Sequence, residues 1–200
     1  MNQSYNKADF QRLCELYREW NSKINVVSRK DIDFLFEHHI LHSLAIREYL
    51  CRKGESLEGL KILDVGTGGG FPGIPLAMTM PQSHFVLCDS IGKKVRVAQA
   101  VAQEIGLQNV ECVNARAESL EGSYDWVVSR AVTSLENFYP FVKGKYRKGI
   151  LYLKGGDVLS EISALCARHG LGADKFRLWN INEWLEDEYF AEKFVIEIRK

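Results

Sequence analysis

A glycine-rich segment that follows a short apolar run constrains the fold of this chain more than any other feature. The run Lys61-Ile62-Leu63 leads into Asp64-Val65-Gly66-Thr67-Gly68-Gly69-Gly70, so an acidic residue lies two positions before the first of three alternating glycines. Gly66, Gly68 and Gly70 can adopt positive φ angles and let a ligand approach bare backbone. The segment predicts a β-strand, a ligand-binding turn and the start of a helix, which is the first unit of an α/β fold.

The charge of Asp64 indicates which ligand this turn binds. A carboxylate at the carboxyl end of the strand repels phosphate and attracts an ammonium group. S-adenosylmethionine suits this arrangement, because its tail is a zwitterionic amino acid rather than a pyrophosphate. We therefore expect a methyltransferase in which Asp64, Gly66, Gly68 and Gly70 position the methionine end of the cofactor.

Two other interpretations of the glycine segment remain open. Gly68-x-Gly70-x-x-Gly73 formally satisfies the dinucleotide motif G-x-G-x-x-G, but that motif places its first glycine at the end of the strand. Counted from Gly66, the third glycine position holds Phe71; counted from Gly68, the loop starts two residues late and prolines interrupt the helix start. The remaining interpretation is a glycine-rich turn that binds no ligand.

Composition and charge narrow the class of protein. The 200 residues fit one domain with an extension, and the formal net charge of zero argues against a general polyanion binder. The cysteines are odd in number and scattered, which favours reduced thiols and no metal site: Cys14, Cys51, Cys88, Cys112 and Cys166. The N-terminal residues lack the pattern of a signal peptide, and no apolar run approaches roughly 18 residues. We expect a cytoplasmic monomer without a membrane segment.

The pattern of apolar residues divides the chain into two parts. Residues 1–58 are predicted to form a helical N-terminal extension, with an apolar stripe from Phe10 to Ile24 and a second helix over Asp31–Leu50. A linker follows between Gly54 and Gly59. Residues 59–200 are predicted to form the methyltransferase domain.

The second part alternates strands and helices, which predicts a parallel sheet covered on both faces. Two strand-like runs with no full helix between them end the chain, which predicts a terminal antiparallel hairpin and a mostly parallel seven-stranded sheet of the class I methyltransferase type. The expected strands are Lys61–Val65, His84–Asp89, Asn109–Asn114, Tyr124–Ser129, Gly149–Lys154, Lys175–Ile181 and Lys193–Arg199. The expected helices include Gly92–Ile105, Ser134–Val142 and Asp157–His169.

Ligands of such sheets bind beyond the carboxyl ends of the strands, so the residues there are the candidates for the site. Asp89 ends the second strand and can accept hydrogen bonds from both ribose hydroxyls, although it could instead cap the next helix. Ala117 and Glu118 follow the third strand, where backbone and carboxylate could contact the adenine edge. A solvated surface loop is the alternative for this pair.

Arg130 follows the fourth strand, where the methyl acceptor should lie. Nearby there is no [DN]-P-P-[FY] motif for an exocyclic amine, no Pro-Cys dipeptide and no acid at the strand end for a ribose hydroxyl. Guanine N7 fits this lack of a general base, because its lone pair needs no deprotonation. An arginine could grip the guanine O6 and N7 edge, a phosphate or the cofactor carboxylate; a surface ion pair near solvent is the alternative.

The segment Leu63–Ala77, with the extension Gly70-Phe71-Pro72-Gly73-Ile74-Pro75, resembles the signature of the bacterial small-subunit rRNA guanine-N7 methyltransferases, the glucose-inhibited division protein B family. Asn25–Ser28, His38–Leu44, Arg116–Glu118, Ser129–Ala131 and Lys154–Gly156 extend the resemblance over nearly the whole chain. It implies methylation of one guanine near the decoding site of 16S rRNA, with that RNA or the small ribosomal subunit as partner. It also implies cofactor contacts at Gly66, Phe71, Ala117, Glu118 and Arg130.

Basic residues near the predicted cofactor site could contact RNA phosphates despite the zero net charge. Arg29 and Lys30 lie in the first loop, and Lys93, Lys94 and Arg96 open a helix; solvated helix faces are the alternative. A further basic run covers residues 143–148. Three histidines, 38, 39 and 42, have helical spacing that resembles a metal site, but we expect a core or RNA-facing role for them.

Two other functions remain possible at this stage. A noncatalytic module that binds the cofactor or the ribosomal subunit would transfer no methyl group in a single turnover. A small-molecule methyltransferase would turn over without RNA.

Overall fold

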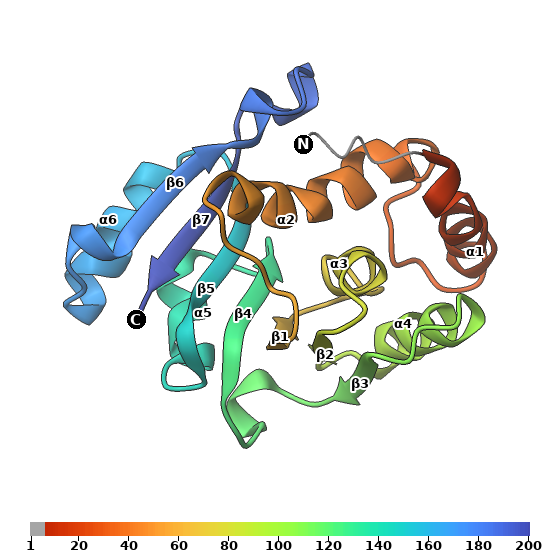
Figure 1. Cartoon of the computed structure of the whole chain (residues 1–200), viewed down its shortest axis with the longest axis horizontal. Helices are drawn as coiled ribbons and strands as arrows, with labels where there is room; N and C mark the ends of the chain where they lie inside the picture. Colours follow the sequence, from red (N-terminus) through yellow and green to blue (C-terminus); the bar gives the residue numbers. More distant parts are fainter. Residues whose placement is uncertain (1–6) are drawn as a thin grey trace.

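The computed structural model describes residues 7–200, and a seven-stranded sheet lies at the centre of this part of the chain (Figure 1). The order across the sheet is β3-β2-β1-β4-β5-β7-β6, in which β7 alone runs antiparallel to its neighbours. The predicted mostly parallel sheet with a terminal antiparallel hairpin is therefore confirmed. The strands are β1 (Lys61–Val65), β2 (His84–Asp89), β3 (Val110–Asn114), β4 (Tyr124–Arg130), β5 (Tyr146–Gly155), β6 (Phe176–Asn180) and β7 (Lys193–Arg199).

The strand order reverses next to β1, which pairs with β2 on one side and with β4 on the other. This reversal separates the loops that follow β1 and β4 and leaves a crevice at the carboxyl ends of the strands. The functional site is expected in that crevice.

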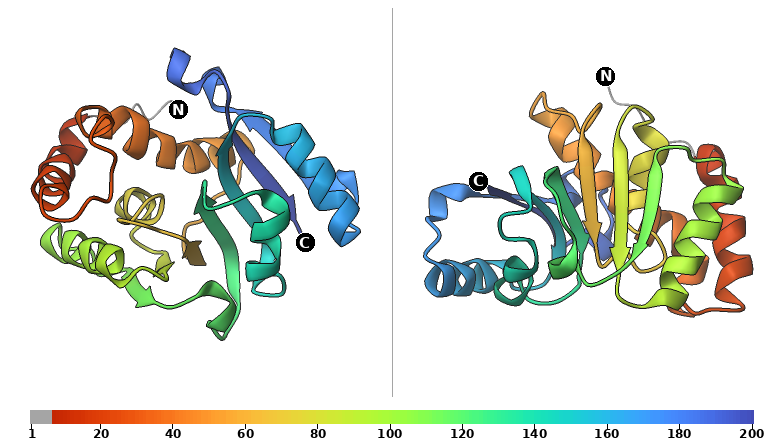
Figure 2. Two further views of the ribbon diagram at one scale, coloured as in Figure 1. Left: turned by 180° about the vertical axis from the view of Figure 1, so that it is seen from behind. Right: turned by 90° about the horizontal axis from the view of Figure 1, so that it is seen from below.

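Helices cover both faces of the sheet (Figure 2). The helices α2 (His42–Arg52), α3 (Gly73–Thr79) and α4 (Gly92–Glu104) share one hydrophobic cluster with Ile62 and Phe85. The helices α5 (Leu135–Val142) and α6 (Val158–His169) share the other cluster with Leu63 and Val86. Neighbouring strand residues thus point to opposite clusters, as the two-residue period of a strand requires.

The N-terminal segment packs on the first of these clusters. The short helix η1 (Lys7–Phe10) leads into α1 (Gln11–Asn21), which lies beside α4 in Figure 1. The residues of the predicted stripe up to Tyr17 are buried, and the rest pack against the same core: Phe10, Leu13, Cys14, Tyr17, Trp20 and Ile24. The extension therefore shares a core with β1 and β2.

The helix expected over Asp31–Leu50 is present, but it is not a regular α-helix throughout. The segment is divided into η2 (Ile32–Phe34), a π-helix η3 (Phe36–Leu41) and α2, which ends at Arg52. The backbone carbonyl of His38 accepts side-chain hydrogen bonds from the distant residues Arg130 and Tyr189. Such tertiary contacts interrupt regular helical bonding, and π-turns of this kind are frequent at functional sites.

Other differences from the predicted elements are small. β5 begins at Tyr146, three residues before the predicted start, and β4 includes Arg130. Short helices complete the fold: η4 (Ala117–Ser119), η5 (Ala173–Lys175), η6 (Ile181–Glu183) and η7 (Glu188–Phe190). The residues that bear on the signal-peptide prediction lie outside the described part of the chain. Within residues 7–200, every helix is too short or too polar to cross a membrane.

Candidate active site

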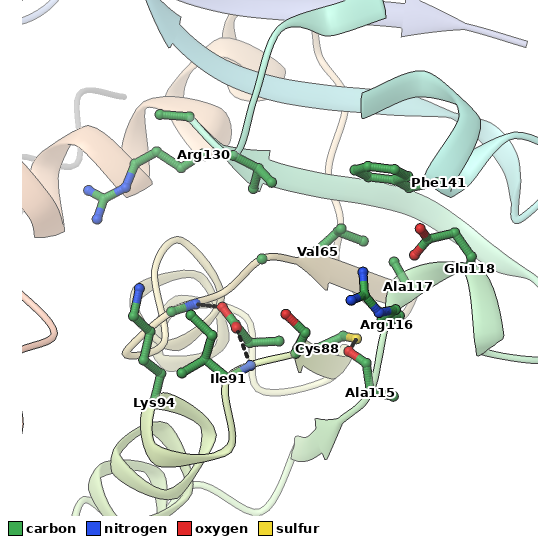
Figure 3. A pocket seen from close by; sticks show the side chains of 16 residues that line it. Val65, Cys88, Ile91, Lys94, Ala115, Arg116, Ala117, Glu118, Arg130 and Phe141 are labelled. Carbon is green, nitrogen blue, oxygen red and sulfur yellow. Dashed lines mark hydrogen bonds between the residues drawn. The ribbon is translucent and has the colours of Figure 1, made fainter. Parts of the chain in front are cut away.

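A pocket of about 410 Å³ opens at the carboxyl ends of β1, β2 and β4 (Figure 3). Its volume lies in the usual range for small-molecule sites. Six of the residues predicted to bind the cofactor line it: Gly66, Gly68, Asp89, Ala117, Glu118 and Arg130. The other three do not line it: Gly70 ends the glycine loop, and Asp64 and Phe71 are buried next to that loop.

The glycine loop adopts the conformation that its sequence predicts. Gly66, Gly68 and Gly70 have φ angles of 69°, 59° and 114°, which residues with a Cβ atom rarely adopt. A Cβ at Gly66 would lie 2.3 Å from a methyl group of Val132, whereas a Cβ at Gly68 would meet no atom within 4 Å. Gly68 therefore presents bare backbone to the pocket.

Asp64 is fully buried beneath this loop. Its Oδ2 accepts hydrogen bonds from the Thr67 hydroxyl at 2.6 Å and from the Gly73 backbone N–H at 2.8 Å. Its Oδ1 is buried without a hydrogen-bond partner. Burial raises the pKa of the carboxyl group to about 7, because the charged form loses hydration. A cation that approached Oδ1 would stabilise the ionised form.

Asp89 lines the pocket and binds two backbone N–H groups. Its Oδ1 accepts a hydrogen bond from the Ile91 backbone N–H at 2.8 Å, just before α4, and its Oδ2 accepts one from the Gly68 N–H at 2.9 Å. The carboxylate thus ties the glycine loop to the start of α4. Each oxygen keeps a further lone pair, so the side chain can still accept hydrogen bonds from a ligand in the pocket.

Ala117 and Glu118 lie in η4 on the wall of the pocket that also holds Phe141 (Figure 3). Ala117 is buried and Glu118 is exposed. The Glu118 backbone carbonyl accepts a hydrogen bond from the Lys145 ammonium at 3.2 Å, which fixes the backbone of this wall. A ligand that lay along the pocket with one end at the glycine loop would therefore meet Ala117 and Glu118 at its other end.

Arg130 ends β4, and the expectation that it is a loop arginine near solvent is wrong. Its Nη2 lies 2.9 Å from His39 Nδ1, its Nη1 donates to the His38 carbonyl at 3.5 Å, and its guanidinium lies 5.0 Å from the centre of the Phe71 ring. The side chain is partly buried, because the π-helical segment packs against it through His38 and His39. Among the described residues, no carboxylate lies within ion-pair distance of this guanidinium.

His39 is a site residue that the sequence did not single out for this role. Burial lowers the pKa of its imidazole to about 3, so the ring is neutral at neutral pH. A neutral ring can accept the Arg130 hydrogen bond at Nδ1 while Nε2 carries the proton. Phe71 completes the support, since its ring packs against Tyr17 at 4.6 Å between centroids. The signal in the sequence was the histidine spacing, for which we expected a core or RNA-facing role rather than a metal site.

The predicted RNA-binding residues differ in where they lie relative to the pocket. Lys93, Lys94 and Arg96 lie in the first turns of α4, with Lys94 on the pocket wall and the other two exposed. Positive side chains at a helix N-terminus oppose the helix dipole and cost stability, so their grouping favours a role in binding an anion. Arg29 and Lys30 are exposed in the turn after α1.

The basic run at residues 143–148 reaches the cofactor pocket at Lys145, whose ammonium donates to the Glu118 carbonyl on the pocket wall. The run surrounds the start of β5, whereas the carboxyl ends of the strands that line the pocket lie at the opposite end of the sheet. Lys145 also donates to the Leu120 carbonyl, and Arg147 pairs with Asp125 at 3.0 Å. Lys143, Arg147 and Lys148 are exposed, and the contribution of this run to a basic rim stays a prediction. The search for metal sites found no suitable group of side chains between residues 7 and 200.

Comparison with known families identifies the chain. The family model GidB, described as rRNA small subunit methyltransferase G, matches residues 6–182. The chain belongs to the GidB family. It is 46% identical over 199 residues to ribosomal RNA small subunit methyltransferase G of Flavobacterium psychrophilum, with 96% of this chain and 90% of the relative covered. It is 48% identical to ribosomal RNA small subunit methyltransferase G of Christiangramia forsetii, with 94% of this chain and 88% of that relative covered.

Solved structures support the fold of this GidB member. Magnesium protoporphyrin IX methyltransferase from Synechocystis, crystallised with bound SAM, is similar with a TM-score of 0.65 at 17% identity over 100% of both chains. A 16S rRNA N2 methyltransferase from T. thermophilus, in complex with AdoMet and guanosine, has a TM-score of 0.59 at 18% identity over 89% of this chain and 44% of that one. The predicted class I methyltransferase fold and the predicted family are both confirmed.

Proposed function

We propose that this GidB protein transfers the methyl group of S-adenosylmethionine to N7 of one guanine in 16S rRNA near the ribosomal decoding site. The observation that carries the proposal is the partly buried Arg130 guanidinium, which lines the pocket at the carboxyl end of β4 and has no carboxylate partner among the described residues. A partly buried cation without a partner is costly, so it favours a ligand that brings an anion.

The residues around the pocket fit the cofactor group by group. The carboxylate of its amino acid tail would meet Arg130, and its ammonium would be drawn to Asp64, whose Oδ1 is buried and unpartnered. The backbone of Gly66, Gly68 and Gly70 would pack against this tail. Asp89 would accept the ribose hydroxyls, and Ala117 with Glu118 would contact adenine. Phe71 would hold Arg130 in place from behind.

The side chains near Arg130 explain why a guanine nitrogen is a suitable acceptor. S-adenosylmethionine, when bound, supplies an electrophilic methyl group. His39 is neutral and already accepts a hydrogen bond at Nδ1, so it is poorly placed to remove a proton from an acceptor. Guanine N7 attacks with a lone pair and needs no base. The protein then acts by orienting the two reactants and excluding water around Arg130.

The partner follows from the same proposal. The RNA or the small ribosomal subunit would approach the carboxyl ends of the strands, where Lys93, Lys94 and Arg96 supply positive charge, and Arg29 and Lys30 would add to it. An enzyme with this substrate works in the cytoplasm, and we propose that it acts as a monomer. Residues 1–58 would serve as the helical extension that braces the site, and residues 59–200 as the methyltransferase domain.

The test is single-turnover transfer of labelled methyl from S-adenosylmethionine to small ribosomal subunits that lack the modification. We expect about one methyl group per subunit. Cofactor binding without transfer would instead support a noncatalytic module, and equal turnover on free guanosine would support a small-molecule enzyme.

A further inference from the structure

A stack of four groups stands beside the π-helical segment, outside the cofactor pocket. The His38 ring lies 3.5 Å from the Tyr189 ring at an angle of 3°, and 4.9 Å from the Phe34 ring at 15°. The Lys193 ammonium lies 3.3 Å from the centre of the Tyr189 ring. Two groups cannot both pack on the same face of one ring at these separations. The order along the stack is therefore Lys193, Tyr189, His38, Phe34.

The two ends of this stack differ. The Lys193 ammonium closes one end by a cation–π contact. At the other end, Phe34 is 53% exposed, which is unusual for a large apolar side chain. A hollow of about 600 Å³ adjoins it, and the lining residues are Phe34, Glu37, His38, Asp187, Glu188 and Tyr189. The stack therefore ends in an open aromatic face beside a space that can admit another flat ring.

The charge of the hollow indicates which part of an RNA can enter it. Half of its lining residues are acidic, namely Glu37, Asp187 and Glu188. Carboxylates repel a phosphate but accept hydrogen bonds from base N–H groups, of which the guanine Watson–Crick edge presents two side by side. Unpaired RNA bases are bound in this way, by stacking on aromatic rings and by hydrogen bonds to their edges. The hollow is thus complementary to an RNA base, whereas its negative charge repels the phosphate backbone.

The stack is joined directly to the reacting end of the cofactor pocket. The His38 backbone carbonyl accepts hydrogen bonds from Arg130 Nη1 at 3.5 Å and from the Tyr189 hydroxyl at 3.4 Å. The β6–β7 connection thus contacts the π-helical segment through Tyr189. A base on Phe34 would therefore lie close to the guanine that meets Arg130.

We propose that the stack ending in Phe34, with the acidic hollow beside it, is a second base-binding subsite that holds an unpaired nucleotide flanking the target guanine. This rests on the proposed function. The subsite would distinguish the correct RNA loop by the presence of an unstacked base with N–H donors, while the basic residues of α4 would hold the phosphates.

An aromatic series at Phe34 tests the stacking. Phe34→Ala and Phe34→Leu should raise KM for small subunits at least fivefold, within the range of about 5- to 150-fold that one base–aromatic stack gives, whereas Phe34→Tyr should stay near the unmodified protein. Cofactor affinity and the salt dependence of RNA binding should not change, because no phosphate contact is lost. Unchanged KM in Phe34→Leu would overturn the subsite. Because Phe34 is exposed, these variants should fold normally.

The acidic residues of the hollow give a second test, in which a base contact and a phosphate contact predict opposite changes in RNA affinity. The double variant Glu37→Gln, Glu188→Gln removes two negative charges beside a polyanion, including the partner of Lys7 in a 3.0 Å ion pair. If the hollow merely faces phosphates, RNA binding should tighten. If the carboxylates accept base N–H groups, binding should weaken. Tighter or unchanged binding would overturn the assignment to a base.

A photo-crosslink identifies the occupant. With p-benzoylphenylalanine in place of Phe34, we expect crosslinks to an unpaired nucleotide within a few positions of the methylated guanine. Crosslinks to a ribosomal protein, or to distant RNA alone, would overturn the subsite. Methyl transfer by the unmodified protein is measured first on the same subunits, so its absence would refute the proposed function rather than this inference.

Discussion

Replacement of Arg130 by alanine should weaken cofactor binding and methyl transfer far more than it weakens the fold. A charge-assisted contact to the cofactor carboxylate contributes about 2–3 kcal/mol, so its loss should raise the Kd for S-adenosylmethionine roughly 30- to 150-fold. In the free protein, the same change leaves His39 Nδ1 without its donor at 2.9 Å, a cost of about 1–3 kcal/mol. That cost is offset because a partly buried cation with no carboxylate partner is removed. The free energy of unfolding should therefore change by less than about 2 kcal/mol.

The assay combines calorimetric titration of S-adenosylmethionine, single-turnover transfer to unmodified small subunits and denaturant unfolding. Arg130→Lys should recover only part of the loss, since lysine keeps the charge without the planar fork. Arg147→Ala is the matched control, because Arg147 is an exposed arginine paired with Asp125 at the far end of the strands. If Arg130→Ala keeps both affinity and transfer within threefold of the unmodified protein, Arg130 contacts neither the cofactor nor the guanine.

Three further predictions follow from the same geometry. Gly68→Val should abolish cofactor binding measured by calorimetry while the protein still folds, because a branched side chain would enter the pocket and resist a φ of 59°; equal affinity would remove Gly68 from the site. Changing Lys93 and Lys94 to alanine should flatten the slope of log affinity for RNA against log salt by roughly one unit per lost phosphate contact, and an unchanged slope would exclude the pair. The pKa of Asp64 is about 7, so its carboxylate ionises as pH rises through 7; cofactor affinity should rise between pH 6 and 8, and in Asp64→Asn this rise should be absent. A parallel rise in both proteins would show that another group titrates.

The sequence predicted the elements that rest on local signals. The bounds of β1, β2 and β7 agree with the prediction, because each is a largely apolar run bounded by polar residues or by a glycine-rich turn. The positive φ angles of the glycine loop were also predictable, since only glycine adopts them without strain. Asp89 was predicted to bind a ligand or to cap a helix; the structure places it on the pocket wall, where it accepts a hydrogen bond from the Ile91 N–H, and α4 has no side-chain cap.

The rest depends on contacts between residues far apart in the chain. The periodicity of residues 31–50 fits a regular helix, whereas the π-helical turn holds the His38 carbonyl that the distant residues Arg130 and Tyr189 approach. The burial of Arg130 has the same origin, because a residue 91 positions earlier supplies its hydrogen-bond acceptor. The aromatic stack likewise joins residues that no local pattern connects, Phe34 and Tyr189.

The most direct test of the account is a mass-spectrometric map of 16S rRNA from small subunits treated with the protein and S-adenosylmethionine, compared with untreated subunits. The account predicts one added methyl group, on N7 of a single guanine near the decoding site, and its loss in the Arg130→Ala variant. A methyl group on another atom or another base, or no change in the map under conditions where the cofactor binds, would contradict it.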